Sequence, residues 1–180
     1  TILLNGKDIH GLNTAQVNRA GIARTFQNIR LFGELSVEEN ITVAMDTQMH
    51  YTMPEGILRL PRFWQEERVV HERAMELLSI FHMEDLAGAK ASSLPYGAQR
   101  RLEILRALAT NPSLLLLDEP AAGMNPSETA ELMENIRSIR DTFKIAVLLI
   151  EHDMNLVMNI CEGIAVLNFG RVIAKGTPED

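Results

Sequence analysis

Cysteine and long apolar runs are the features that this sequence most lacks. Cys161 is the only cysteine in 180 residues, which excludes an intramolecular disulfide and a cysteine-based zinc cluster. We therefore expect a reducing, cytoplasmic setting, with Cys161 a small buried apolar residue. No stretch approaches the roughly 18–20 apolar residues that span a bilayer, and no basic segment followed by an apolar one opens the chain. Any role at a membrane is thus expected to be peripheral, through a partner.

Positive charge is also scarce. The formal net charge is −7 and the pI is near 5.3, which argues against binding of nucleic acid through bulk charge. Hydrophobic residues still make up 46% of the chain, enough for one domain with a real core and room for a subdomain.

A phosphate-binding loop of the form G-x-x-x-x-G-K-[ST] is absent from the sequence. In such a loop, backbone N–H groups and the lysine hold the phosphates of a nucleotide. Gly6-Lys7 is the only Gly-Lys pair among the 11 glycines; Asp8 follows it, and no glycine precedes it by five residues. The chain begins at Thr1 as a strand running into a turn, without an initiator methionine, so we expect it to be the remainder of something longer.

What the sequence does contain is an apolar run, Leu114–Leu117, that ends in Asp118-Glu119-Pro120. A buried strand of this kind delivers two carboxylates at its C-terminal edge. Asp118 is then a candidate Mg²⁺ partner, directly or through water, and Glu119 a candidate base that polarises an attacking water. The alternative is that these acids only cap the following helix.

Two further polar residues also follow expected strands. His152 comes after the apolar run Ile145–Ile150, where its ring could reach a neighbouring strand exit and bind a γ-phosphate and the attacking water. Gln27 follows the strand expected at 22–26 and could touch both Mg²⁺ and water. Taken alone, a single histidine or glutamine is more often structural.

A fourth signal is the turn Leu94–Arg101, which lets a helix begin with free N–H groups facing outward. Such a helix start is a ready anion site, although it is also an ordinary way for a helix to begin.

Periodicity and turn residues predict the elements. The expected strands are residues 2–4, 22–26, 114–118, 145–150, 164–168 and 171–174; the expected helices are within 37–50 and 64–86, from about 97 to 110, from 126, and within 154–161; residues 51–63 are expected to be an irregular loop. Strands alternating with helices around a helical middle predict an α/β core with a mostly parallel sheet and an inserted helical subdomain.

The order of these signals resembles the ATP-binding subunit of ABC transporters over essentially the whole chain. On this resemblance, the Q-loop is Gln27; the signature is Leu94, Pro95, Tyr96, Gly97 and Ala98, with Gln99; the Walker B pair is Asp118 and Glu119; the D-loop is Ala122, Gly123, Met124 and Asn125; and the switch histidine is His152.

The family resemblance implies a P-loop NTPase-type core with a small antiparallel β part. It divides the chain into residues 1–30 of the core, a helical subdomain at 31–108 with the signature, and the core again at 109–180. It implies ATP and Mg²⁺ as cofactors, with Gln27, Asp118 and His152 binding nucleotide, Gln27 and Asp118 holding the metal, and Glu119 and His152 catalytic. Each ATP would lie between one subunit's phosphate loop and the other subunit's signature.

Finer features resemble the importers of branched-chain amino acids. They are Arg24–Phe32, Leu35–Asn40, the proline-containing loop before Glu66, Pro95–Gly97 and Glu151–Met154. This class implies a second ATP-binding subunit, identical or not, transmembrane permease subunits and, indirectly, a substrate-binding protein. It also implies a peripheral position on the cytoplasmic face of the inner or plasma membrane, where hydrolysis drives transport.

Two positions depart from the family pattern. Ala98 stands where the family usually has Gln or Glu, and Asn125 replaces the usual D-loop aspartate. The phosphate loop and the aromatic that stacks on adenine would lie upstream of Thr1. We therefore expect marginal stability, open strand edges, exposed apolar faces on Leu114–Leu117 and no ATPase activity of the chain alone.

Three alternatives remain at this point. A non-catalytic module could lend its signature to a partner's phosphate loop. A DNA-repair or chromosome-structure ATPase shares the cassette but needs long insertions for which this length leaves no room. A metal hydrolase built on Asp118, Glu119, His152 and Asp153 would explain the carboxylates, but it would explain neither Gln27 nor the signature.

Overall fold

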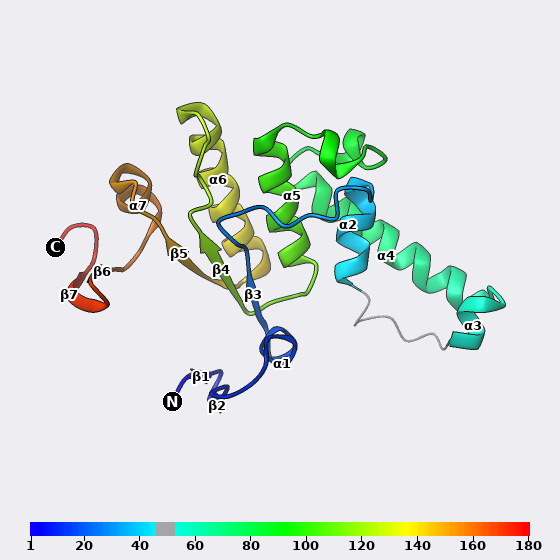
Figure 1. Cartoon of the computed structure of the whole chain (residues 1–180), viewed down its shortest axis with the longest axis horizontal. Coiled ribbons are helices and arrows are strands. Elements are labelled where there is room, and N and C mark those ends of the chain that lie inside the picture. The colour runs from blue at the N-terminus through cyan, green and yellow to red at the C-terminus, as the bar shows by residue number, and fades with distance from the viewer. Residues whose placement is uncertain (46–52) are drawn as a thin grey trace.

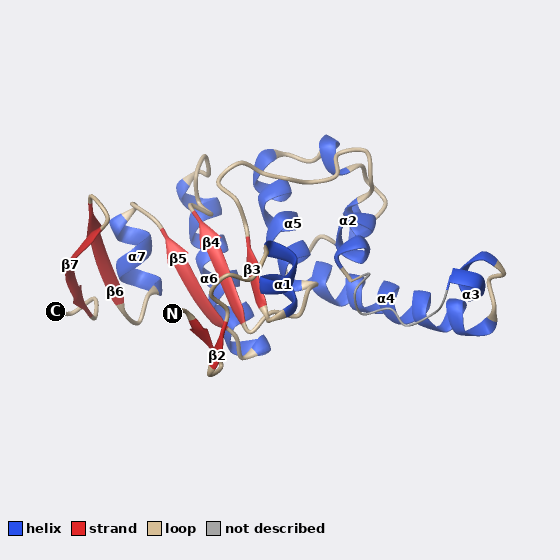
Figure 2. Cartoon of the chain, turned by 60° about the horizontal axis from the view of Figure 1, so that its bottom comes forward, coloured by secondary structure: helices blue, strands red, loops and turns tan. Residues whose placement is uncertain are grey.

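The computed structural model describes residues 1–45 and 53–180. Its centre is a three-stranded parallel sheet in the order β3-β4-β5, formed by Ile22–Arg24, Leu114–Asp118 and Ala146–Ile150 (Figures 1 and 2). The strands are in register, with Ala23 opposite Leu115 and Asp118 opposite Ile150. Because all three run in one direction, their carboxyl ends lie at one edge of the sheet.

Helices α5 (Tyr96–Leu108) and α6 (Pro126–Phe143) pack beside this sheet. Leu115 and Leu117 of β4 are fully buried, in one core with Leu132 and Ile136 of α6. The expectation of exposed apolar faces on Leu114–Leu117 is therefore wrong. A strand between two neighbours and covered by helices buries its apolar side chains, and Leu114 and Leu116 are still half-buried.

The expected open edge is present on β5 instead. Its outer side pairs with no strand among the described residues, and its side chains Leu148 and Ile150 are 55% and 53% exposed. The next elements are α7 (Met154–Ile160) and a separate antiparallel hairpin of β6 (Ile164–Asn168) and β7 (Arg171–Gly176). At the N-terminus, β1 (Leu3–Leu4) and β2 (Lys7–Asp8) form a second hairpin, followed by α1 (Thr14–Arg19).

The middle of the chain is helical, as expected, with different boundaries. The helices are α2 (Val37–Ala44), α3 (Met53–Ile57) and α4 (Pro61–Ser79), with short 3₁₀ turns η2 (Glu84–Leu86) and η3 (Ala91–Ser93) before α5. The irregular loop expected at 51–63 is wrong over its described part, because α3 lies there and α4 already begins at Pro61. Proline suits the first turn of a helix, where its missing N–H costs nothing. The helix expected to reach residue 50 lies outside the described residues beyond 45.

Apolar side chains join α2, α4 and α5 into the larger part of the core. Ile41, Leu77 and Leu102 are inaccessible to solvent. Ala74, Leu77 and Leu78 of α4 and Phe81, which follows it, are buried, whereas Val69 is 63% exposed. In the described part of the chain, no helix is both long and apolar enough to cross a membrane.

Asn40 fixes the segment that leaves β3 for α2. Its side chain is fully buried; the Oδ1 atom accepts from Phe32 N at 2.9 Å, and the Nδ2 atom donates to Phe32 O at 3.0 Å and Ser36 O at 2.9 Å. Residues 28–36 have no helix or strand of their own, so this amide supplies backbone partners that regular structure would otherwise provide.

We expect Asn40→Ala to lower the free energy of unfolding by about 1–3 kcal/mol, because Phe32 N would lose its acceptor, although Phe32 O would keep its bond from Leu35 N at 3.1 Å. Asn159→Ala is the matched control, since that exposed side chain bonds only Asn155 O among the described residues. Urea unfolding of both variants measures the difference, and equal midpoints would contradict this role of Asn40.

Candidate functional site

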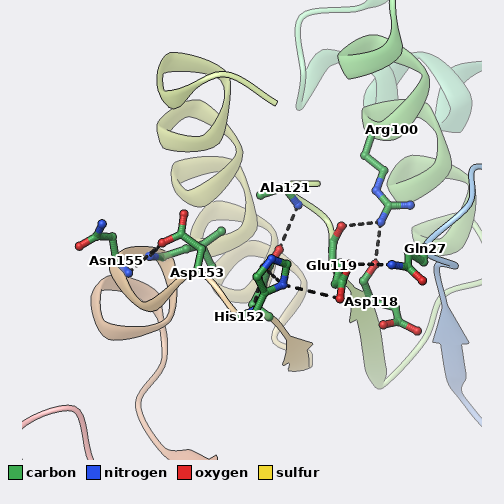
Figure 3. A network of polar contacts seen from close by, with 10 residues as sticks. Gln27, Arg100, Asp118, Glu119, Ala121, His152, Asp153 and Asn155 are labelled. Carbon is green, nitrogen blue, oxygen red and sulfur yellow. Dashed lines mark hydrogen bonds and ion pairs between the residues drawn. The ribbon is translucent and has the colours of Figure 1, made fainter. Parts of the chain in front are cut away.

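Three polar side chains converge at the carboxyl edge of the parallel sheet (Figure 3). Gln27 follows β3, Glu119 follows β4 and His152 follows β5. Gln27 Nε2 donates to Glu119 Oε2 at 2.8 Å, and His152 Nδ1 lies 3.6 Å from Glu119 Oε1. The structure thus brings together three of the four residues that the strand-exit pattern singled out, with Glu119 at their centre and the His152 ring open to solvent.

Glu119 is held in an unusual backbone conformation. Its φ is 45°, in the left-handed region, and its N–H donates to Ile150 O at 2.9 Å. A following proline such as Pro120 favours extended backbone at the residue before it, so the left-handed conformation of Glu119 is not one that Pro120 promotes. A non-glycine residue keeps such a conformation only where neighbouring bonds enforce it, which fixes the direction of the Glu119 side chain.

Asp118 binds a cation of the chain itself. Arg24 Nη2, from β3, lies 2.8 Å from Asp118 Oδ2, and the Arg24 side chain is 52% exposed. A partly exposed ion pair of this kind contributes little stability, so the carboxylate remains available to another cation. The sequence patterns did not single out Arg24; the signal was its place within the strand expected at 22–26, of which it is the last residue in the structure.

The residues beside His152 serve the backbone. Glu151 Oε1 accepts from Ala121 N at 3.2 Å, tying the exit of β5 to the turn after β4. Asp153 caps α7 by accepting from Asn155 N and Leu156 N at 2.9 Å and 3.3 Å. Within residues 1–45 and 53–180, no three His, Cys, Asp or Glu side chains are grouped as a metal site. The structure therefore gives no support to a metal hydrolase in which Asp153 is a ligand.

The signature residues lie at the start of α5, apart from the three strand-exit residues. Pro95 is the N-cap and no side chain caps the helix, while Gln99 Nε2 donates to Leu94 O at 2.8 Å. Among the described residues, no hydrogen bond or ion pair joins residues 94–99 to Gln27, Glu119 or His152. The first-turn N–H groups of this helix have no side-chain partner, as the anion-site interpretation requires.

The signature instead packs on the D-loop, Ala122–Asn125. A Cβ atom on Gly123, whose φ is 78°, would lie 3.2 Å from Tyr96 Cε1. One on Gly97 would lie 3.2 Å from Glu128 Oε1. A Cβ atom at either glycine would require Tyr96 or Glu128 to shift, so the start of α5 lies against the D-loop and the first turn of α6.

The D-loop leads directly from Glu119 into α6. Ala122 N donates to Glu119 O at 3.2 Å, and Met124 N donates to Ala121 O at 3.1 Å. Asn125 is the N-cap of α6: its Oδ1 accepts from Glu128 N at 3.0 Å, and Glu128 Oε2 accepts from Asn125 N at 2.9 Å. This reciprocal pair is a capping box, so the side chain at 125 stabilises the helix start.

Comparison with known proteins agrees with this geometry. The family model described as "ABC transporter" matches residues 1–122. The chain belongs to the ABC transporter family. Among solved structures, an ATP-binding cassette of an ABC transporter in its ADP conformation superposes with a TM-score of 0.76 at 30% identity, covering 95% of this chain and 66% of that one. The α/β fold is thus that of an ABC ATPase cassette, with its parallel sheet, helices and small antiparallel part.

Curated relatives cover nearly the whole chain. The high-affinity branched-chain amino acid transport ATP-binding protein LivG of Escherichia coli is 46% identical over 179 residues, which is 99% of this chain and 70% of that protein. The protein BraF of Pseudomonas aeruginosa, with the same description, is 44% identical over 178 residues, 99% of this chain and 70% of its own. The chain therefore spans about 70% of the length of these relatives.

We expect Asn125→Ala to lower the free energy of unfolding by about 1 kcal/mol, because it removes the cap of α6. Asn125→Asp keeps an accepting oxygen at the same place and serves as the matched variant, expected to unfold at nearly the original urea concentration. Equal unfolding midpoints for the Ala and Asp variants would contradict the cap.

Proposed function

We propose that this chain is an ATP-hydrolysing subunit of an ABC importer for branched-chain amino acids. The observation that carries the proposal is the convergence of Gln27, Glu119 and His152 at adjacent strand exits, in a chain 44% and 46% identical to two branched-chain amino acid transport ATP-binding proteins. The contacts of Glu119 support a role as general base. One carboxylate oxygen accepts from Gln27 and the other faces His152, so a water bound there would meet a fixed acceptor.

ATP supplies the terminal phosphoanhydride that such a water attacks. Around it, the chain would contribute Glu119 to take the proton from the water, and His152 to hydrogen-bond the phosphate and the water. Gln27 orients Glu119 from the opposite side without adding charge. The exposure of the His152 ring fits a group that meets a ligand from outside the chain.

Gln27 and Asp118 are the residues proposed to hold Mg²⁺. Amide and carboxylate oxygens are ligands that this ion accepts, and it usually takes only one or two protein ligands beside phosphate oxygens and waters. The lack of a group of three acidic or imidazole side chains in the described part of the chain agrees with that mode. In the structure the Asp118 carboxylate pairs with Arg24, so this ion pair would have to break before Asp118 could bind Mg²⁺.

The signature residues 94–99 and the D-loop residues 122–125 are proposed to face a second ATP-binding subunit, identical or not. Their separation from Gln27, Glu119 and His152 supports this, because a helix start that does not reach its own site is free to contact a nucleotide held by another chain. Ala98 would contribute no side-chain hydrogen bond there.

The proposed division is residues 1–30 and 109–180 as the core, and residues 31–108 as the helical part that contacts transmembrane permease subunits. A substrate-binding protein would be an indirect partner of this subunit, which would lie on the cytoplasmic face of the membrane. The direct path from β3 through residues 28–36 to α2 supports this coupling, since Gln27 and the helical part share one segment.

Glu119→Gln is expected to slow phosphate release about 10²–10⁴-fold, the usual contribution of a general base. The measurement uses the transporter complex that contains this chain, with ATP and Mg²⁺. Glu162→Gln is the control, because in the described part of the chain that exposed carboxylate pairs only with Arg140. Hydrolysis by the Glu119→Gln complex at the unchanged rate would overturn the proposal. For the isolated chain we expect no phosphate release.

A further inference from the structure

Arg100 is a fully buried arginine whose N–H groups all have acceptors. The side chain belongs to α5. It is distant from the exits of β3 and β4 in the sequence but lies against both of them in space (Figure 3). Its Nε donates to Pro120 O at 3.3 Å, and its Nη2 to Asp118 O at 2.6 Å and Glu119 O at 2.8 Å. Its Nη1 donates to Phe26 O and to Glu103 Oε2, the latter at 2.7 Å. Five donors thus meet five acceptors.

The acceptors lie on both sides of the contact between Gln27 and Glu119. Phe26 O is the carbonyl just before Gln27, and the carbonyls of residues 118–120 surround Glu119. Glu103 continues the network, because its Oε1 accepts from Arg30 N at 3.3 Å. The Arg100–Glu103 pair therefore holds the Q-loop before and after Gln27 and holds the turn that carries Glu119.

We propose that Arg100, oriented by Glu103, is a positioning residue that sets the geometry of Glu119 and Gln27 and joins it to α5, the helix that begins with the signature. The inference rests on the proposed ATPase function. A shift of α5 moves the guanidinium, and the guanidinium moves the carbonyls on either side of Glu119. A movement of the signature would then change the position of the general base in the same chain.

Burial of an ion pair does not by itself explain this arrangement. Replacing a buried pair by apolar residues of similar volume is often neutral or stabilising, so stability alone does not require arginine at position 100. What arginine supplies is a planar fork with five donors aimed at several carbonyls at once, whereas lysine has three. Five directed hydrogen bonds are needed to join the exits of β3 and β4 to α5.

The first test compares Arg100→Lys and Arg100→Met in the transporter complex that contains this chain. Displacement of a catalytic group by about 1 Å costs about 10²-fold in rate, so we expect kcat for ATP hydrolysis to fall by about that factor. KM for ATP should change little, because no acceptor of Arg100 is a side chain proposed to bind nucleotide. Leu77→Ala, which empties a buried site on α4, is the destabilised control, and Arg140→Met is the control for loss of an arginine.

The second test is the double variant Arg100→Met, Glu103→Leu, which removes both buried charges together. We expect its thermal unfolding midpoint to return toward that of the unchanged protein while kcat stays low. Amide hydrogen exchange should also be faster around residues 26–30 and 118–121 than in Leu77→Ala. A double variant with kcat within about threefold of the unchanged complex, a difference of less than about 0.7 kcal/mol in barrier, would overturn the proposal.

The two proposals fail in different ways. If Glu119→Gln hydrolyses ATP normally, the proposed function is wrong. If Glu119→Gln is inactive but Arg100→Lys and Arg100→Met keep the kcat of the Leu77→Ala control, the function stands and the positioning role is wrong. Should Arg100→Met fail to fold, Arg100→Lys, which keeps the charge and loses the fork, decides between these outcomes.

Discussion

Parallel pairing of three short strands is the constraint on which the rest of this structure depends. The register that sets Asp118 opposite Ile150 also sets Glu119 beside the exit of β5, where Glu119 N reaches Ile150 O. A shift of one residue would reverse the faces of β4 and take the buried Leu115 and Leu117 out of the core. The register that buries Leu115 and Leu117 is therefore also the register that places the Glu119 carboxylate.

The sequence was enough to find the residues that follow strands. Gln27, Glu119 and His152 follow the expected strands, and parallel strands bring their carboxyl ends to one edge, so their meeting could be predicted without coordinates. The capping role of Asn125 was also readable, because its partner Glu128 is only three residues away. Local spacing and strand direction carry this information.

Contacts between distant residues could not be predicted in the same way. Arg100 binds main-chain carbonyls, which every residue has, so no pattern of side chains marks its targets. Arg24 and Asp118 are 94 residues apart and pair through the register of β3 with β4. The helix α3 was missed because Pro54 and Gly56 within five residues favour a loop, whereas proline is tolerated in a first turn.

The exposed outer edge of β5 has a consequence for how this chain behaves by itself. Unpaired N–H and C=O groups there lie beside the apolar side chains Leu148 and Ile150, and neither a proline nor a charge interrupts the strand. An edge of that kind templates the addition of any extended segment, including one from another copy. Self-association of the isolated chain through β5 should thus increase with its concentration and compete with correct assembly.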